Sequence, residues 1–167
     1  LERWGRDPLP KYTELAESPV STPELAEKYP YILNSGLRSP TFFHSANRQV
    51  PWLREIRPDP LVEIHPDTAE TFGIYDGEWV YIKNDLGRVK RKAKLTRKVH
   101  PEHIQTLHGW WLPEHKGPEP DLFGVWDYQI NLLIPGPQCS KSGFGGGQYK
   151  TTLVTLEKMG PGRADHG

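Results

Sequence analysis

Apolar and polar side chains alternate with a period of two along several short segments, which is the spacing of β-strands with one buried face. These segments are YILNS at 31–35, LVEIH at 61–65, EWVYIKN at 78–84, GRVKRKAKLT at 87–96, IQTLH at 104–108 and TTLVTLEK at 151–158. The turn sequences DG at 76–77 and DLG at 85–87 flank the third segment. The pattern predicts a β-hairpin over residues 78–96 and four further strands.

Helical spacing is confined to short segments. We expect one turn of helix after Ser21, a short helix in VPWLREI at 50–56, and a helix in PDTAETFGI at 66–74 that stops at Gly73. Residues 109–148 are predicted to be mostly irregular. Strands therefore outnumber helices and are unevenly spaced, which favours a mainly β protein with short helices, a compact barrel or sandwich, over a doubly wound sheet.

Composition suits one domain, because 167 residues with 35% apolar content can bury one ordinary core. Residues 1–28 carry three proline-marked pieces, DPLP, ESPV and STPEL, with few apolar side chains. We interpret them as an extended arm, the remnant of a preceding domain. The domain itself is expected to span residues 29–159, and residues 160–167 are expected to be a disordered tail.

Net charge and cysteine content exclude several classes of function. The chain has 21 basic and 21 acidic residues, so no global field recruits nucleic acid or an anionic membrane. Cys139 is the single cysteine, which excludes an internal disulfide and a multi-thiolate metal site. No apolar run approaches the length of a membrane span. The compartment stays open between the cytoplasm and the periplasm of a prokaryote.

Two charged clusters have simple explanations. Alternation places Arg88, Lys90, Lys92 and Lys94 on one face of their strand and Val89, Ala93 and Leu95 on the other. A solvated outer face explains this basic row, and the absence of interleaved aromatic residues leaves base stacking unsupported. Four histidines between residues 100 and 115 lack the helical spacing of a zinc-protease site, so no metal ligands are assigned.

Residues 33–49, LNSGLRSPTFFHSANRQ, follow a strand-like run with many hydrogen-bond donors. Arg38 and Arg48 each offer a planar fork that fits a phosphate or carboxylate, and Gly36 permits a close backbone approach. A solvated loop whose arginines pair with surface acids is the equal alternative. Further on, HGWW at 108–111 ends a strand, so its adjacent indoles face opposite ways: one is suited to stack on a ligand, or simply to plug a barrel end.

The order and spacing of these pieces resemble a known family. YPYILNSGLRSPTFFHS, then LVEIHPDTAETFGIYDGEWVYIKNDLGRVKRKAKLT, then HGWW, and last NLLIP with a glycine-rich run and QYK are similar to the C-terminal dinucleotide-binding domain of molybdopterin oxidoreductases. These are the large subunits related to formate dehydrogenase, dimethyl sulfoxide reductase and thiosulfate or polysulfide reductase. The resemblance covers about residues 29–159. It implies a double-psi β-barrel, of the aspartate-decarboxylase-like kind, that clamps a molybdopterin guanine dinucleotide.

The resemblance also implies which residues contact the cofactor. Matching positions are Gly36, Arg38, Ser39, His44, Ser45 and Arg48 for pterin or diphosphate, with His108, Trp110, Trp111, Asn131, Gln148 and Lys150 beside the cofactor. The loop at 135–147, PGPQCSKSGFGGG, departs from the acid-containing pattern of the family, and as a phosphate loop it lacks the lysine-serine ending and the helix of a P-loop.

The implied function is to bind this cofactor within the large subunit of a molybdenum or tungsten oxidoreductase. The metal's protein ligand would come from a missing domain, so the chain alone is not expected to be catalytic. Expected partners are the other domains of the same subunit, with an iron–sulfur electron-transfer subunit as a further candidate, and neither nucleic acid nor direct membrane insertion is expected. The alternative is a stand-alone double-psi barrel for binding or assembly, without cofactor.

Overall fold

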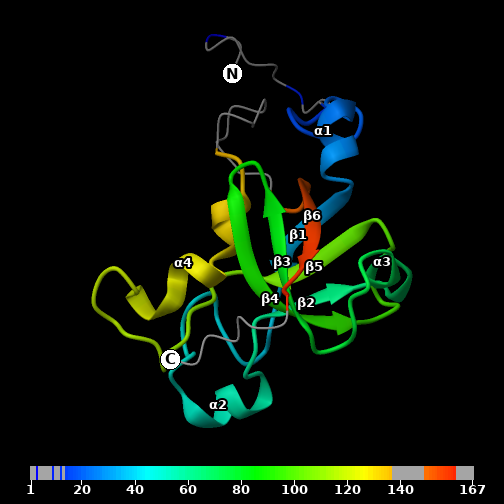
Figure 1. The fold of residues 1–167 in the computed structure, drawn as a ribbon. Helices are drawn as coiled ribbons and strands as arrows, with labels where there is room; N and C mark the ends of the chain where they lie inside the picture. Colours follow the sequence, from blue (N-terminus) through cyan, green and yellow to red (C-terminus); the bar gives the residue numbers. More distant parts are fainter. Residues whose placement is uncertain (1–2, 4–8, 10–11, 13, 137–148, 161–167) are drawn as a thin grey trace.

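The computed structural model describes residues 3, 9, 12, 14–136 and 149–160. Six strands close into a barrel in the order β1-β5-β2-β4-β3-β6 (Figure 1). Their bounds are β1 Tyr31–Leu37, β2 Leu61–Ile64, β3 Trp79–Asn84, β4 Gly87–Leu95, β5 His103–Leu107 and β6 Thr152–Lys158. Each falls on a segment with predicted alternation, so the mainly β class is confirmed; the double-psi crossing stays a prediction.

Two of the neighbouring strand pairs are parallel, β1 with β5 and β2 with β4. The other four pairs are antiparallel. A parallel pair brings the carboxyl ends of both strands to the same place, so the loops that follow them start as neighbours. This pairing of β1 with β5 determines where the candidate site forms.

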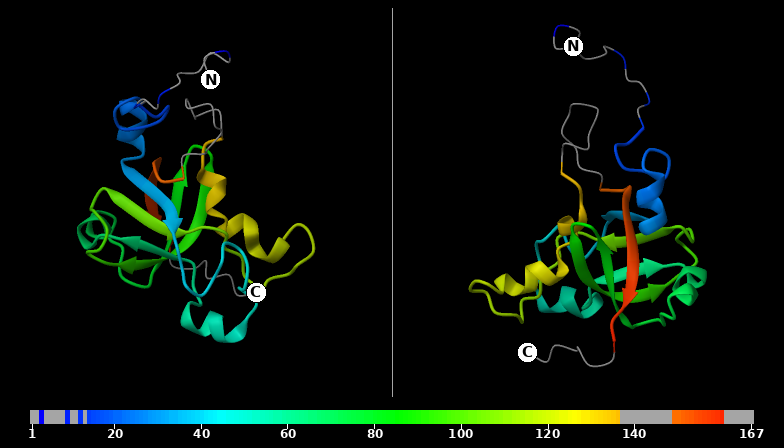
Figure 2. Two further views of the ribbon diagram at one scale, coloured as in Figure 1. Left: turned by 180° about the vertical axis from the view of Figure 1, so that it is seen from behind. Right: turned by 45° about the horizontal axis from the view of Figure 1, so that its top comes forward.

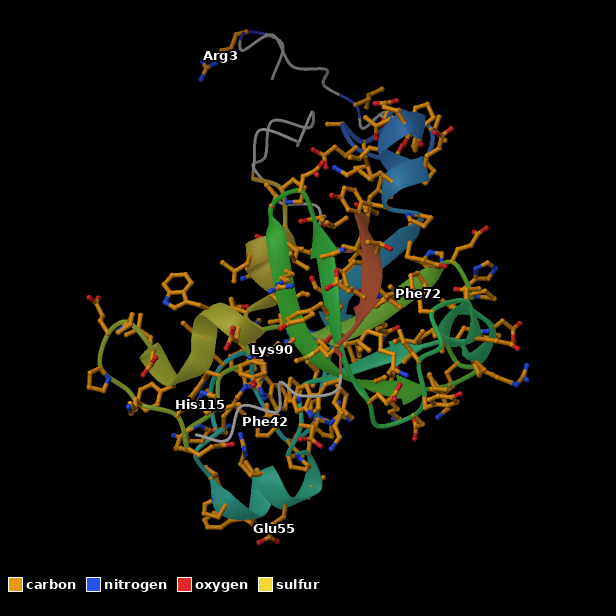
Figure 3. All side chains as sticks on the ribbon, in the orientation of Figure 1. Arg3, Phe42, Glu55, Phe72, Lys90 and His115 are labelled. Carbon is orange, nitrogen blue, oxygen red and sulfur yellow. The ribbon has the colours of Figure 1, made fainter. Side chains whose placement is uncertain are left out.

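The hairpin of β3 and β4 follows its sequence pattern closely. Val80, Ile82 and Val89 have no exposed surface and fill the barrel. The outward row of β4 is paired with carboxylates, including Lys90 with Asp127 at 3.3 Å (Lys90 is labelled in Figure 3). The row thus faces outward as predicted, but it is ion-paired and only partly exposed, since the Lys90 side chain is 12% exposed.

Four short α-helices flank the barrel in the described part of the chain. They are α1 Pro23–Lys28, α2 Pro51–Ile56, α3 Pro66–Thr71 and α4 Val125–Tyr128. The views agree that α1 and α2 lie at opposite ends of the molecule (Figure 2). The first three were predicted, and α3 is followed by Gly73 at a φ of 61° as its stop signal indicates.

The fourth helix lies in the segment after residue 108, which was predicted to be mostly irregular and, in its described part, is irregular outside residues 122–133. Residues 122–133 form the 3₁₀ helix η2 (Leu122–Gly124), then α4, then the 3₁₀ helix η3 (Ile130–Leu133). Each is a single turn, too short for a 3.6-residue period to show in the sequence. Tertiary packing holds them, since Tyr128, Ile130 and Leu133 are buried.

Most of the buried apolar residues form two clusters. The larger one fills the barrel and includes Leu33, Val62, Ile64, Ile82 and Ile104. The smaller one consists of Phe42, Leu107, Trp110, Leu112 and Tyr128. The smaller cluster joins the loops after β1 and β5 to α4, and it forms the base of the candidate site.

Across the described part of the chain, no helix has the length and apolar character needed to cross a membrane. The expected arm lies partly outside the described residues, and the expected tail lies almost wholly outside them. Where the arm meets the barrel it is anchored, because Lys28 pairs with Asp85 and the Tyr29 hydroxyl donates to the same carboxylate at 2.6 Å. The division of the chain at residues 28 and 159 stays a prediction.

Candidate functional site

The candidate site forms where β1 and β5 end together. Leu37 is paired with Leu107, so the loop at 38–50 and the segment at 108–112 begin side by side. A register shift between Asn34 and Leu37 ends the regular pairing. Phe42, from the first loop, lies between the barrel and α2 (Figure 3). Two stretches that are about 60 residues apart in sequence thus meet because their strands are parallel.

Arg48 joins the two loops. Its Nε donates to the carbonyl of Gly109 at 2.9 Å, and one terminal nitrogen donates to the carbonyls of His44 and His108, both at 3.2 Å. Its guanidinium carbon lies 4.4 Å from the ring centroid of Phe42 and 3.8 Å from that of Trp110. Planar donors and a flat stacking face are properties of arginine that lysine lacks.

The charge of Arg48 has no counterion among the described residues. The side chain is 1% exposed, and its second terminal nitrogen, Nη1, is buried without a hydrogen-bond partner. Burial, with Arg54 and Arg57 nearby, lowers its pKa to about 10, so it stays charged at neutral pH. A buried cation with a free donor is costly unless an acceptor approaches it.

A histidine pair lies beside this arginine. Nε2 of His108 is 2.7 Å from Nδ1 of His44, and Nδ1 of His108 is 3.2 Å from the carbonyl oxygen of Ser35. Desolvation lowers the pKa of His108, and the neighbouring His44, Arg38 and Arg48 lower it further, against the opposing hydrogen bond to Ser35. His108 is therefore neutral at pH 7.

Gly109 allows the two loops to touch. Its φ is +65°, and a Cβ there would lie 2.8 Å from the carbonyl carbon of His44 and 2.9 Å from the nitrogen of Ser45. Two residues after Gly109, Nε1 of Trp111 donates to the carbonyl of Ser45 at 2.6 Å. Glycine at 109 is thus required both by its backbone angle and by close contact.

A pocket of about 110 Å³ opens between the loops. It is lined by Leu37, Arg38, Ser39, Phe42, Phe43, His44, Arg48, Leu107 and His108. We call it the arginine pocket. Two arginines and two histidines line it, together with a serine and apolar side chains, and no acidic residue does. Because its charge is entirely positive, the pocket suits an anion.

A further basic residue approaches from the segment that precedes β6. The nitrogen and the hydroxyl of Ser35 both donate to the carbonyl of Tyr149, at 2.9 and 2.7 Å. This brings Lys150 alongside Gly36, where a Cβ would lie 3.2 Å from Cε of the lysine. Gly36 therefore leaves room for the Lys150 side chain.

The structure brings most of the residues predicted from sequence together. Around the pocket and the loops that build it lie Gly36, Arg38, Ser39, His44, Ser45, Arg48, His108, Trp110, Trp111 and Lys150. Within this set Arg38 and His44 are exposed, whereas Trp110 has no exposed surface and packs beneath Arg48. Trp110 thus has the packing position that the sequence left open as the alternative to ligand stacking.

Two predicted residues stand apart from this set. Asn131 is exposed on η3 and does not line the pocket. Its neighbour Leu133 accepts a hydrogen bond from Asn84 at the tip of the β3–β4 hairpin, 2.8 Å away. Gln148 lies outside the described residues, as does most of the glycine-rich loop. Contact of these residues, and of the set around the pocket, with a cofactor stays a prediction.

Sequence reasoning missed one charged residue near the site. Arg91 has no exposed surface and lies on the inner row of β4, between Val89 and Ala93. The alternation that placed its lysine neighbours outside also places Arg91 inside. The signal was therefore present in the sequence, as a charged residue at an inward position.

Comparison with known proteins agrees with this geometry. The sequence profile of the Molydopterin dinucleotide binding domain matches residues 31–152, from the start of β1 to the start of β6. The chain belongs to this family. The resemblance inferred from the sequence is thereby confirmed, and with it the function of a molybdopterin dinucleotide binding domain.

Individual relatives of this molydopterin dinucleotide binding domain include a dehydroxylase and a hydratase. The chain is 41% identical over 127 residues to dopamine dehydroxylase of Eggerthella lenta. The matched region covers 75% of this chain and 12% of that protein. The chain is also 40% identical over 126 residues to acetylene hydratase of Syntrophotalea acetylenica. This match covers 75% of this chain and 17% of that protein.

A solved structure is also similar. Acetylene hydratase from Pelobacter acetylenicus matches with a TM-score of 0.84 at 32% identity, covering 95% of this chain and 22% of that chain. The chain thus spans only 12–22% of the length of these relatives. They are large proteins, and this chain corresponds to one small domain of them.

Proposed function

We propose that the arginine pocket holds the diphosphate-bearing part of a molybdopterin guanine dinucleotide. The observation that carries this proposal is the buried Nη1 of Arg48, a charged donor without a partner beside a pocket that has no acidic lining residue. A phosphate oxygen is the acceptor that such a fork binds best. Arg38, which is exposed on the rim, adds further donors.

The residues present fit such a group. Their donors belong to arginine, serine and lysine side chains, which suit phosphate oxygens, and Gly36 and Gly109 keep the backbone close to the pocket. A bound cofactor would supply the redox-active metal, molybdenum or tungsten. This chain's own residues would bind and orient the cofactor and neutralise its charge.

The larger protein is proposed to be the large subunit of a molybdenum or tungsten oxidoreductase. Its other domains would supply the metal's protein ligand and contact this one, and an iron–sulfur subunit is a candidate electron-transfer partner. One observation supports contact with other domains: Trp52 and Ile56 of α2 are 68% and 69% exposed, one helical turn apart. Two large apolar side chains on one helix face favour a covered surface.

The experiment uses the full-length subunit with Arg38→Ala. Because Arg38 is exposed and lines the pocket, its loss should lower the pterin and metal content severalfold, and not merely lower the melting temperature. Arg97→Ala, an exposed arginine outside the pocket, is the control and should keep full occupancy. Full occupancy in Arg38→Ala would contradict the proposal.

The finer parts of the proposal have their own measurements. Acid hydrolysis of the purified subunit should release GMP, the nucleotide of the guanine dinucleotide form, and CMP alone would contradict that form. Elemental analysis of the same sample distinguishes molybdenum from tungsten. A subunit that carries no pterin at all would favour the stand-alone barrel instead.

A further inference from the structure

Arg91 is a second buried arginine at the same end of the barrel. It lies on the inner row of β4 and has no exposed surface. Lysines on either side of it in sequence point outward and pair with carboxylates, Lys90 with Asp127 and Lys92 with Asp59. Arg91 has no such partner in any ion pair of the described residues.

Its hydrogen bonds go only to neutral oxygens. Nε donates to Oγ1 of Thr106 at 2.9 Å, and the two terminal nitrogens donate to the carbonyls of Lys90 at 2.8 Å and Leu107 at 3.4 Å. Every nitrogen of the guanidinium therefore has an acceptor. What is missing is a negative charge rather than a hydrogen-bond partner.

The two buried arginines hold consecutive carbonyls of one segment. Arg91 donates to Leu107, and Arg48 donates to His108 and Gly109. Leu107 and His108 both line the arginine pocket. Arg91 thus lies directly behind a pocket wall, on the side away from solvent.

Two like charges are buried close to each other here. Desolvation, with a second contribution from Arg48, lowers the pKa of Arg91 to about 9, still well above neutrality, so both guanidiniums remain charged. Burying two unpaired cations is unfavourable, because the protein interior screens them far less than water does. An anion in the pocket would supply the missing opposite charge to both.

We propose that Arg91 supplies part of the positive charge that holds a polyanion in the arginine pocket, without touching it. The inference rests on the proposed function of the pocket. It adds an electrostatic binding residue that lies behind the wall rather than in the lining. A purely structural Arg91, needed only to tie β4 to β5, is the competing explanation.

The charge distinguishes these two explanations. Arg91→Gln retains an amide that can reach Thr106 but removes the charge, whereas Arg91→Lys retains the charge and loses the fork. Lys92→Gln is the matched control, because it removes one charge from the next position of the same strand, on the outer face. The probe is inorganic pyrophosphate, titrated into the 167-residue chain at neutral pH and low salt and followed by NMR.

We expect Arg91→Gln to weaken pyrophosphate binding about tenfold, because the interior transmits the field of a buried charge well. Arg91→Lys and Lys92→Gln should each stay within about threefold of the wild type, since a buried charge is kept in one and a screened charge is lost in the other. Wild-type affinity in Arg91→Gln, or equal losses in Arg91→Gln and Arg91→Lys, would overturn the proposal in favour of the structural explanation.

A measurement on the unmodified chain covers the case in which a variant does not fold. The Nε–H resonances of Arg48 and Arg91 should both move with pyrophosphate and yield the same dissociation constant. A shift of Arg48 alone would overturn the role of Arg91 and leave the pocket's function intact. No pyrophosphate binding by the wild type would overturn both.

Discussion

Nε2 of His108 lies 2.7 Å from Nδ1 of His44, and this contact fixes the protonation of both rings. The carbonyl of Ser35 can only accept, so Nδ1 of His108 carries a hydrogen, and in the neutral pair Nε2 of His108 accepts from His44. A proton on Nε2 of His108 would place two N–H groups against each other, so the contact opposes protonation of His108.

The histidine pair predicts a pH dependence of stability. Burial lowers the pKa of His108, so between its unfolded pKa, about 6.5, and its lower folded pKa the unfolded chain binds more protons. Above about pH 6.5 His108 therefore does not lower the free energy of unfolding, and this free energy falls as the pH decreases through the window. Melting temperatures across the window should fall more steeply in the wild type than in His108→Gln.

His100→Gln is the control for this pH dependence, because the His100 side chain is 62% exposed. That variant should follow the wild-type curve. If the His108→Gln and wild-type curves coincide, His108 contributes nothing to the pH dependence and the account of the pair is wrong.

The contact between the two loops predicts a large effect at Gly109. Gly109→Ala places a Cβ 2.8 Å from backbone of His44 at a φ of +65°, so it combines backbone strain with a clash. Gly73→Ala has nearly the same φ, +61°, and open space around the new carbon. We expect unfolding free energies lowered by about 3 kcal/mol or more in Gly109→Ala and about 1 kcal/mol in Gly73→Ala.

Urea unfolding of the two glycine variants measures this difference. Because strain is common to both, the difference between them isolates the loop contact. Equal losses would mean that residues 44 and 45 move aside, and that the close approach of the loops is not required for folding.

The stacking of Arg48 on two aromatic rings predicts that lysine cannot replace it. Arg48→Lys keeps the charge but loses the planar face and most of the hydrogen bonds to the carbonyls of residues 44, 108 and 109, so about 2–4 kcal/mol of stability should be lost. Arg88 stacks on Tyr81 with its guanidinium carbon 4.2 Å from the ring centroid, but its side chain is 50% exposed.

Arg88→Lys is therefore the control and should cost less than about 0.5 kcal/mol. Chemical denaturation followed by tryptophan fluorescence reports both, since Trp110 lies against Arg48. Similar small losses in the two variants would show that the three carbonyls and the two rings contribute little to holding Arg48.

The strands of the barrel could be predicted well from the sequence. Alternation of apolar and polar residues located all six strands, and the DG and DLG turns set the hairpin of β3 and β4. The helix α4 could not be predicted in this way. Its single turn depends on packing of Tyr128 into the smaller core, which no local pattern reveals.

The candidate residues could be selected from the sequence, but their arrangement could not. Arg38, Arg48 and His108 were selected from donor chemistry and family resemblance, and they do line one pocket. That Arg48 would be buried and held by carbonyls of the 108–109 segment depends on the parallel pairing of β1 and β5, which alternation does not specify. Arg91 was missed although its inward position could be counted from its neighbours.

The central claim is that the arginine pocket grips the diphosphate of the cofactor. The most direct measurement is an experimental structure of the full-length subunit with its pterin dinucleotide bound. The account predicts phosphate oxygens within hydrogen-bonding distance of Arg38 and of Nη1 of Arg48. Phosphates located instead beside Asn131 on η3, with Nη1 of Arg48 still unpartnered, would contradict it.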